Sequence, residues 1–119
     1  MEKCFSVKVI DGITITCFFN KPTLLDAKKA MDEALLTAQC RLMLWDLKEG
    51  IDLPAEQLKE IARYGKKVNS LPSRAGIIAS DDVSFGLMRI YDAYREQEQH
   101  ETRVFRSRQQ AIKWLKEFI

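Results

Sequence analysis

A chain of 119 residues, with 46% hydrophobic and 30% charged residues, has the length and composition of one compact globular domain, which we expect to cover residues 1–119. Its 19 basic and 17 acidic residues are spread along the chain, which argues against nucleic acid as a partner, because proteins that bind phosphate backbones concentrate lysine and arginine. No apolar run reaches the roughly 18–20 residues that cross a bilayer, and the start lacks the pattern of a secretory signal. We therefore expect a cytoplasmic protein without integral membrane association.

The sequence offers little for a metal, a cofactor or a disulfide. Cys4, Cys17 and Cys40 are odd in number and far apart, and His100 is the only histidine. This spacing fits neither a disulfide framework nor a zinc site, so we interpret the cysteines as small apolar residues. Neither a P-loop nor a dinucleotide-binding glycine pattern occurs, and we expect no metal and no cofactor.

The first two predicted elements form a β-hairpin. Residues Phe5–Ile10 and Ile13–Phe19 alternate between apolar and polar side chains and are rich in β-branched residues. Asp11-Gly12 lies between them, and this pair tolerates the positive φ angles that a type I′ turn requires at both central positions.

A helix and a buried strand follow. The apolar period becomes helical after Thr23, and Asp26 lies three residues further on, in a capping-box arrangement. Residues 41–47 form an almost continuous apolar run, which is typical of a strand covered on both faces. Pro54 suits the first position of a second helix, because proline has no N–H to leave unpaired there.

The second half of the chain repeats the alternation. Residues 75–80 predict a short buried strand, and a third, amphipathic helix begins beyond Asp82. A strand over 102–106 precedes Ser107, which caps a last helix with Gln110 three residues later. The apolar positions of the third helix are Val83, Leu87, Ile90, Tyr91 and Tyr94, and the inner positions of the last are Ala111, Ile112, Leu115 and Ile119.

The predicted order is thus ββαβαβαβα. Alternating strands and helices with right-handed crossovers indicate an α/β fold. We expect a mixed five-stranded sheet, in which the N-terminal hairpin is followed by parallel strands, covered by four helices.

Four segments resemble the SpoIIAA-like family of small bacterial proteins, which belongs with the STAS domains and is also described as SEC14-like. They are LMLWDL, LPAEQLKEIARYGKK, AGIIASDDVSFGLMRIYDAY and RVFRSRQQAIKWL, between about residues 41 and 115. The most specific elements are F-G-L-x-R-x-Y and V-F-R-x-x-x-x-A-x-x-W-L. The N-terminal hairpin and first helix fit the family in pattern only.

The resemblance implies a regulatory or protein-interaction module. Anti-anti-sigma factors, the best-known members of the wider fold, dock on a kinase and are switched by phosphorylation of a serine in a D-S-S-G-L-G motif. The corresponding segment here, WDLKEGIDLPAEQL, has no serine or threonine between Asp46 and Arg63, so that switch cannot operate there. The SEC14-like side of the family implies an alternative, a protein that binds a small lipid or amphiphile.

Polar residues follow the ends of three predicted strands. Because ligands bind beyond the carboxyl ends of parallel strands, we expect Asp46, Ser80 and Arg106 to lie along one edge. Asp46 is a candidate ion-pair partner for one of the arginines on the third helix and the strand after it, and a solvated row of surface charges is the alternative; these arginines are Arg89, Arg95, Arg103, Arg106 and Arg108. A helix start at this edge offers free N–H groups to an anionic ligand, although helix capping explains the same serine and aspartates. The candidate ligand-binding residues, for a small apolar or anionic ligand, are Asp46, Ser80, Asp81, Ser84, Phe85, Arg89 and Arg106.

The sequence offers few residues for catalysis, and an enzyme that uses Asp81, Ser84 or Arg89 is the least favoured of three hypotheses. His100 lies in the polar segment QEQHET and reads as a surface histidine, and Gly86 reads as room for a packed neighbour. Trp45 and Trp114 are expected in the core or at an interface. We therefore predict a protein that is not an enzyme and binds a protein partner or a second copy of itself, through an apolar helix face or the hairpin edge.

Overall fold

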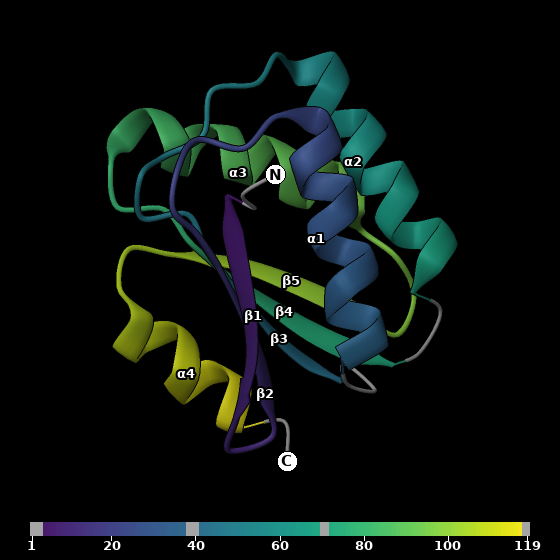
Figure 1. Ribbon diagram of the computed structural model, residues 1–119, viewed down its shortest axis with the longest axis vertical. Coiled ribbons are helices and arrows are strands. Elements are labelled where there is room, and N and C mark those ends of the chain that lie inside the picture. The colour runs from purple at the N-terminus through teal and green to yellow at the C-terminus, as the bar shows by residue number, and fades with distance from the viewer. Residues whose placement is uncertain (1–3, 38–40, 70–71, 118–119) are drawn as a thin grey trace.

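The computed structural model describes residues 4–37, 41–69 and 72–117. It confirms the predicted α/β fold, a mixed five-stranded sheet with four helices in the order ββαβαβαβα. The strands lie side by side in chain order, the first pair antiparallel and the rest parallel (Figure 1). They are β1 (Phe5–Ile10), β2 (Ile13–Phe18), β3 (Leu42–Asp46), β4 (Ser73–Ile78) and β5 (His100–Phe105).

The helices cover both faces of the sheet unequally (Figure 1). Helices α1 (Leu24–Thr37), α2 (Ala55–Val68) and α3 (Asp82–Arg95) lie on one face, and α4 (Arg108–Lys116) lies on the other. The larger apolar core fills the space under the three helices, and a smaller one packs α4 against β3 and β4. No helix in the described part of the chain is both long enough and apolar enough to span a membrane.

The local signals in the sequence are confirmed. Asp11 and Gly12 have φ angles of 53° and 78° in the hairpin turn. Thr23 and Asp26 form a reciprocal capping box, in which each main-chain N–H donates to the other's side chain. Ser107 caps α4 by accepting from the Gln110 N–H at 3.3 Å.

Some boundaries differ from the predicted ones by a residue or two. Strand β4 begins at Ser73 and β5 at His100, two residues earlier than expected in each case, because these two residues pair with each other across the strands. Pro54 is the cap of α2 and not its first helical residue. Cys4 and Cys17 are half-buried free thiols, whereas Cys40 and Ile119 lie outside the described residues.

Of the five apolar positions that make its sequence amphipathic, helix α3 buries Tyr91, half-buries Leu87 and leaves the other three exposed. Its buried residues are Ser84, Met88, Tyr91 and Arg95. Val83, Ile90 and Tyr94 are 70%, 40% and 38% exposed. The expected packing of a neighbour on Gly86 is also wrong, because a Cβ there would have no contact within 4 Å among the described atoms.

Candidate functional site

The carboxyl ends of the parallel strands form one edge, as predicted. Asp46, Ile78 and Phe105 lie in one register row across β3, β4 and β5. Main-chain bonds continue just beyond the strands, where the Leu47 N–H donates to the Ile78 carbonyl at 3.0 Å. Ser80 and Arg106 therefore follow at the same edge as Asp46.

Their side chains, however, turn to opposite faces of the sheet. Asp46 is 7% exposed and accepts from Arg108 of α4 at 2.9 Å. Its second oxygen, Oδ1, is buried without a hydrogen-bond partner among the described residues. Arg106 lies on the α3 side, 2.6 Å from Asp82 and 3.2 Å from the Ser80 carbonyl. Asp46 thus pairs with one of the candidate arginines, as expected, but that arginine is Arg108. Arg106 lies on the opposite face, because side chains alternate along the strands.

The start of α3 is held by internal hydrogen bonds. Asp81 caps the helix by accepting from the Ser84 N–H at 2.8 Å, and this bond lowers the pKa of the Asp81 carboxyl. The Ser84 hydroxyl is buried, accepts from the Ile51 N–H at 2.9 Å and donates to the Ile51 carbonyl at 3.4 Å. It thus fastens the loop between β3 and α2 to α3. Of the two interpretations of this segment, the structure favours helix capping.

The two remaining candidate residues, Phe85 and Arg89, differ in their positions relative to this edge. The Arg106 guanidinium lies 4.2 Å from the centre of the Phe85 ring, a cation–π contact. Arg89 is exposed one helical turn further along α3, where its charge acts on Asp92. The structure thus gathers Ser80, Asp81, Ser84, Phe85 and Arg106 around the α3 start and leaves Asp46 and Arg89 outside the group.

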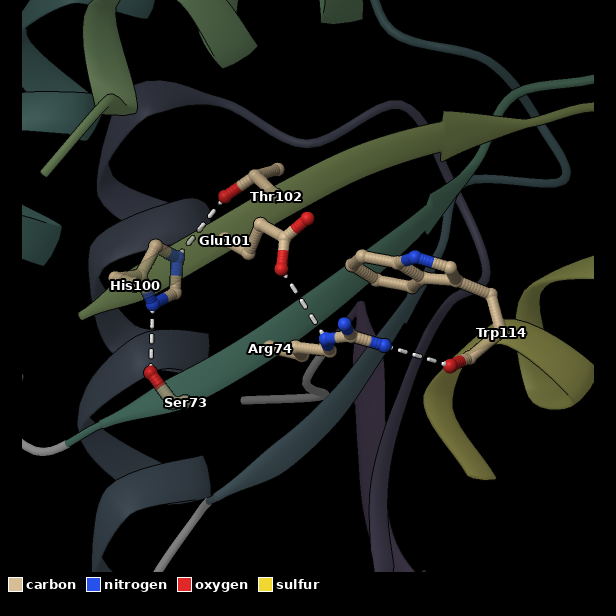
Figure 2. A network of polar contacts seen from close by, with 6 residues as sticks. All are labelled: Ser73, Arg74, His100, Glu101, Thr102 and Trp114. Atoms are coloured by element: carbon tan, nitrogen blue, oxygen red, sulfur yellow. Dashed lines mark hydrogen bonds and ion pairs between the residues drawn. The ribbon is translucent and has the colours of Figure 1, made fainter. Parts of the chain in front are cut away.

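A second polar cluster lies at the opposite end of the strands (Figure 2). His100 Nδ1 is 2.6 Å from the Ser73 hydroxyl, and Nε2 is 2.9 Å from the Thr102 hydroxyl. His100 is only 9% exposed, so the expectation of a surface histidine is wrong. The polar sequence around it concealed that His100 is the first residue of β5 and points inward with Thr102.

A buried arginine acts on this histidine. Arg95 is 3% exposed and donates to Gln97 at 2.6 Å and to the Gly65 carbonyl at 3.2 Å. Burial, and then the charge of Arg95, lower the pKa of His100 to about 4. The imidazole is therefore neutral at pH 7, with one nitrogen as donor and the other as acceptor.

The Ser73–His100 contact resembles the serine–histidine pair of a catalytic triad, but the cluster lacks two requirements of a triad. Ser73 is 1% exposed, so its hydroxyl is out of reach of a substrate. The second ring nitrogen contacts a threonine hydroxyl, where a triad would place a carboxylate. The arrangement therefore holds β4 to β5 and satisfies buried polar groups.

Two arginines contact the Trp114 ring on the α4 side of the sheet, and Figure 2 shows one of them, Arg74. The guanidinium centres of Arg74 and Arg103 lie 4.7 and 5.3 Å from the centre of the indole ring. Arg74 also donates to the Trp114 carbonyl at 3.1 Å and pairs with Glu101 at 3.2 Å. Trp114 is 6% exposed, as expected for a core residue, and these contacts fix the last turns of α4 to the sheet.

An apolar cavity of about 50 Å³ lies between the sheet and the three helices of the larger core. Such a volume holds a few water-sized molecules, because one water needs about 10–15 Å³ by the same measure. Among the residues that line it are Phe18, Met31, Trp45, Leu58, Met88 and Tyr91.

One surface combines apolar and basic side chains, and we call it the α2–α3 face. Its apolar row has the helical spacing i, i+4, i+7, i+11 along α3. Lys59 of α2 lies 5.9 Å from the Tyr94 ring centre, which places its side of α2 next to this row. The face consists of the exposed Val83, Ile90 and Tyr94 on α3, with Leu87 half-buried between them and the larger core, and the exposed Lys59, Arg63 and Lys66 on α2.

No protein-family model and no curated protein matches the chain.

Proposed function

We propose that the chain is a non-enzymatic, STAS-like regulatory or protein-interaction module that docks a protein partner on the α2–α3 face. The observation that carries the proposal is the outward-facing apolar row of α3. A sheet with four helices in this order is also what the SpoIIAA-like resemblance implies, and it supports the proposal.

The apolar row has the form of a helix-docking surface. Val83 and Tyr94 are eleven residues apart, so the row extends about 16 Å along α3 at the usual helical rise. Val83 is 70% and Ile90 40% exposed, which is costly in water unless a partner covers them. Apolar rows with this spacing are the stripes through which two amphipathic helices pack against each other.

The charges beside the row specify the partner further. Lys59, Arg63 and Lys66 follow one another at i, i+4 and i+7 on α2, so they share one side of that helix. A partner helix lying on α3 would bring one flank close to these cations. We therefore expect an amphipathic helix whose flank carries aspartate or glutamate, because complementary charges guide association and fix orientation.

The polar groups at the sheet edge support an interaction role over catalysis. Asp81 and Ser84 are engaged in capping, and Asp82 is engaged with Arg106. The buried Ser84 hydroxyl is also inaccessible to a kinase in this conformation. A phosphoserine switch at Ser84 is therefore not part of the proposal, whereas Ser80 is exposed.

The proposal is tested by affinity purification of the tagged chain from its native cells. Val83→Glu and Ile90→Glu put anionic side chains into the apolar row, and both sites are exposed enough for the fold to survive. We expect a protein that co-purifies with the wild-type chain to be lost with both variants. Lys113→Glu, an exposed site on α4, serves as the matched control and should retain it.

Circular dichroism and thermal unfolding of each variant establish that the fold is intact. A co-purifying protein that binds the Val83→Glu and Ile90→Glu variants as well as it binds the wild type would contradict docking on this face.

The apolar cavity favours a second candidate, binding of a small lipid or amphiphile. Its lining has the right chemistry, but ligand pockets usually measure about 300–1,000 Å³. The cavity of about 50 Å³ would have to open severalfold. Native mass spectrometry of the chain purified from cells tests this candidate, because a bound lipid adds its mass to that of the chain. If only the mass of the unliganded chain is found, lipid binding is contradicted and the interaction role is the one that stands.

A further inference from the structure

Strand β1 forms an open margin of the sheet (Figure 1). Among the described residues, no strand pairs with its outer side. Lys8 is its only charged residue, and Val9 and Ile10 are 48% and 50% exposed. Edge strands are usually protected by several charges, a proline or a covering element, so an apolar strand at this position invites pairing.

The hairpin determines which main-chain groups point outward. The Phe19 N–H donates to the Cys4 carbonyl at 2.7 Å, just beyond the strand ends. In an antiparallel ladder every second residue bonds to the neighbouring strand, so Ser6 and Lys8 bond to β2 as well. Val7 and Val9 therefore direct their N–H and C=O groups to the open side.

We propose that this edge pairs with β1 of a second copy of the chain, antiparallel, about a two-fold axis beside Val7. Val7 then lies opposite the partner's Val7, and Lys8 lies opposite the partner's Ser6. A register centred on Lys8 would place two lysines opposite each other, which is destabilising. The result is a continuous ten-stranded sheet across the dimer.

The other edge strand of the sheet, β5, is unsuited to pairing with β1, so that assembly would end at a dimer. Strand β5 carries Glu101 and Arg103 at exposed positions, and Gln97 bridges to His100 at its start. These charges make β5 a poor partner for the apolar β1, so pairing stops at two copies and does not extend into a fibre. The inference goes beyond the proposed function, since the dimer would present two α2–α3 faces to one partner assembly.

Light scattering over a wide range of protein concentration tests the dimer. The expected mass rises from 13.8 kDa toward twice that value. Val7→Pro removes an outward N–H and leaves the bonds to β2 intact, as proline on an edge strand can. We expect it to raise the dimer dissociation constant about tenfold or more, because several hydrogen bonds depend on close approach at this point.

The matched control is Val104→Pro on β5. The Ser73 and Ala79 N–H groups donate to Gln99 and Phe105, so the alternate residue Val104 also directs its N–H away from the sheet. This variant should dimerise like the wild type. If the Val7→Pro variant does not fold, Val9→Lys at a half-exposed site provides a second variant that should weaken the dimer.

Amide hydrogen exchange locates the contact. The Val7 and Val9 amides should become protected as protein concentration rises. The inference is overturned by a mass that stays at one chain throughout, or by a dimer that survives in both the Val7→Pro and Val9→Lys variants.

Discussion

At the scale of single residues, the buried imidazole of His100 couples protonation to folding. Its pKa is about 4 in the folded chain, because of burial and of Arg95, against about 6.5 for an exposed histidine. The unfolded chain therefore binds more protons between these values. The free energy of unfolding should be at its full value above pH 6.5 and fall by about 2–3 kcal/mol as the pH drops to 4.

Two measurements check this prediction. Since the chain has one histidine, its imidazole resonances in NMR titrate without overlap, and an apparent pKa below 5 is expected. Denaturant unfolding of a His100→Gln variant should depend less on pH over the same window. An imidazole that titrates between pH 6 and 7 would show that the ring is solvated.

Two glycines give opposite expectations for the same substitution. Gly50 has a φ angle of 87°, and an added Cβ would lie 3.0 Å from the Ser84 hydroxyl oxygen and 3.2 Å from Asp81. Gly50→Ala should cost about 1–3 kcal/mol in unfolding free energy, through backbone strain and a disturbed capping contact. Gly86→Ala, in an exposed helix position with open space around it, should instead stabilise by about 0.5–1 kcal/mol. Equal effects of the two changes in denaturant unfolding would contradict this description.

At the scale of elements, the apolar residues of α3 differ widely in how deeply they are buried. Met88 is 4% exposed and packs in the larger core, whereas Ile90 is 40% exposed. Met88→Ala should lower the free energy of unfolding by about 2–5 kcal/mol. Ile90→Ala should change it by about 0.5 kcal/mol or less. Thermal and denaturant unfolding compare the two directly, and a larger loss from Ile90→Ala would mean that α3 is rotated from the position described here.

The elements were predictable from sequence because their signals are local. The hairpin turn at Asp11, the capping box at Thr23 and the cap at Ser107 each depend on residues within a few positions of one another. The buried face of α3 was not predictable, because it depends on distant partners. Ser84 and Arg95 can be buried only because Ile51 and Gly65 supply hydrogen-bond groups from other elements.

The same distinction holds for the candidate site. The edge at Asp46 followed from the alternation of strands and helices, which fixes where parallel strands end. The actual ion pairs, Asp46 with Arg108 and Asp82 with Arg106, depend on which face each side chain takes. For Asp46 and Arg106, the alternation of side chains along β3 and β5 would have predicted which face of the sheet each one takes. His100 was missed because its strand begins within a polar stretch.

At the scale of the whole molecule, the interior is well filled and the surfaces for contact lie outside it. The larger core contains a cavity of about 50 Å³, and polar groups at each end of the sheet form hydrogen bonds with their neighbours. Exposed apolar side chains lie on α3, at the end of β1, on α1 and just after β2. A dimer through β1 would carry two α2–α3 faces, and simultaneous engagement of both would strengthen binding to a bivalent partner.

The central claim is that the outward-facing row of α3 is where a protein partner docks. Site-specific photo-crosslinking in native cells tests it most directly, with the crosslinking amino acid placed at residue 90 or, as a control, at residue 113 on α4. We expect a discrete crosslinked species from residue 90 that maps to an acidic amphipathic helix, and no such species from residue 113. Crosslinking to such a partner from residue 113 and not from residue 90, or from neither position, would contradict it.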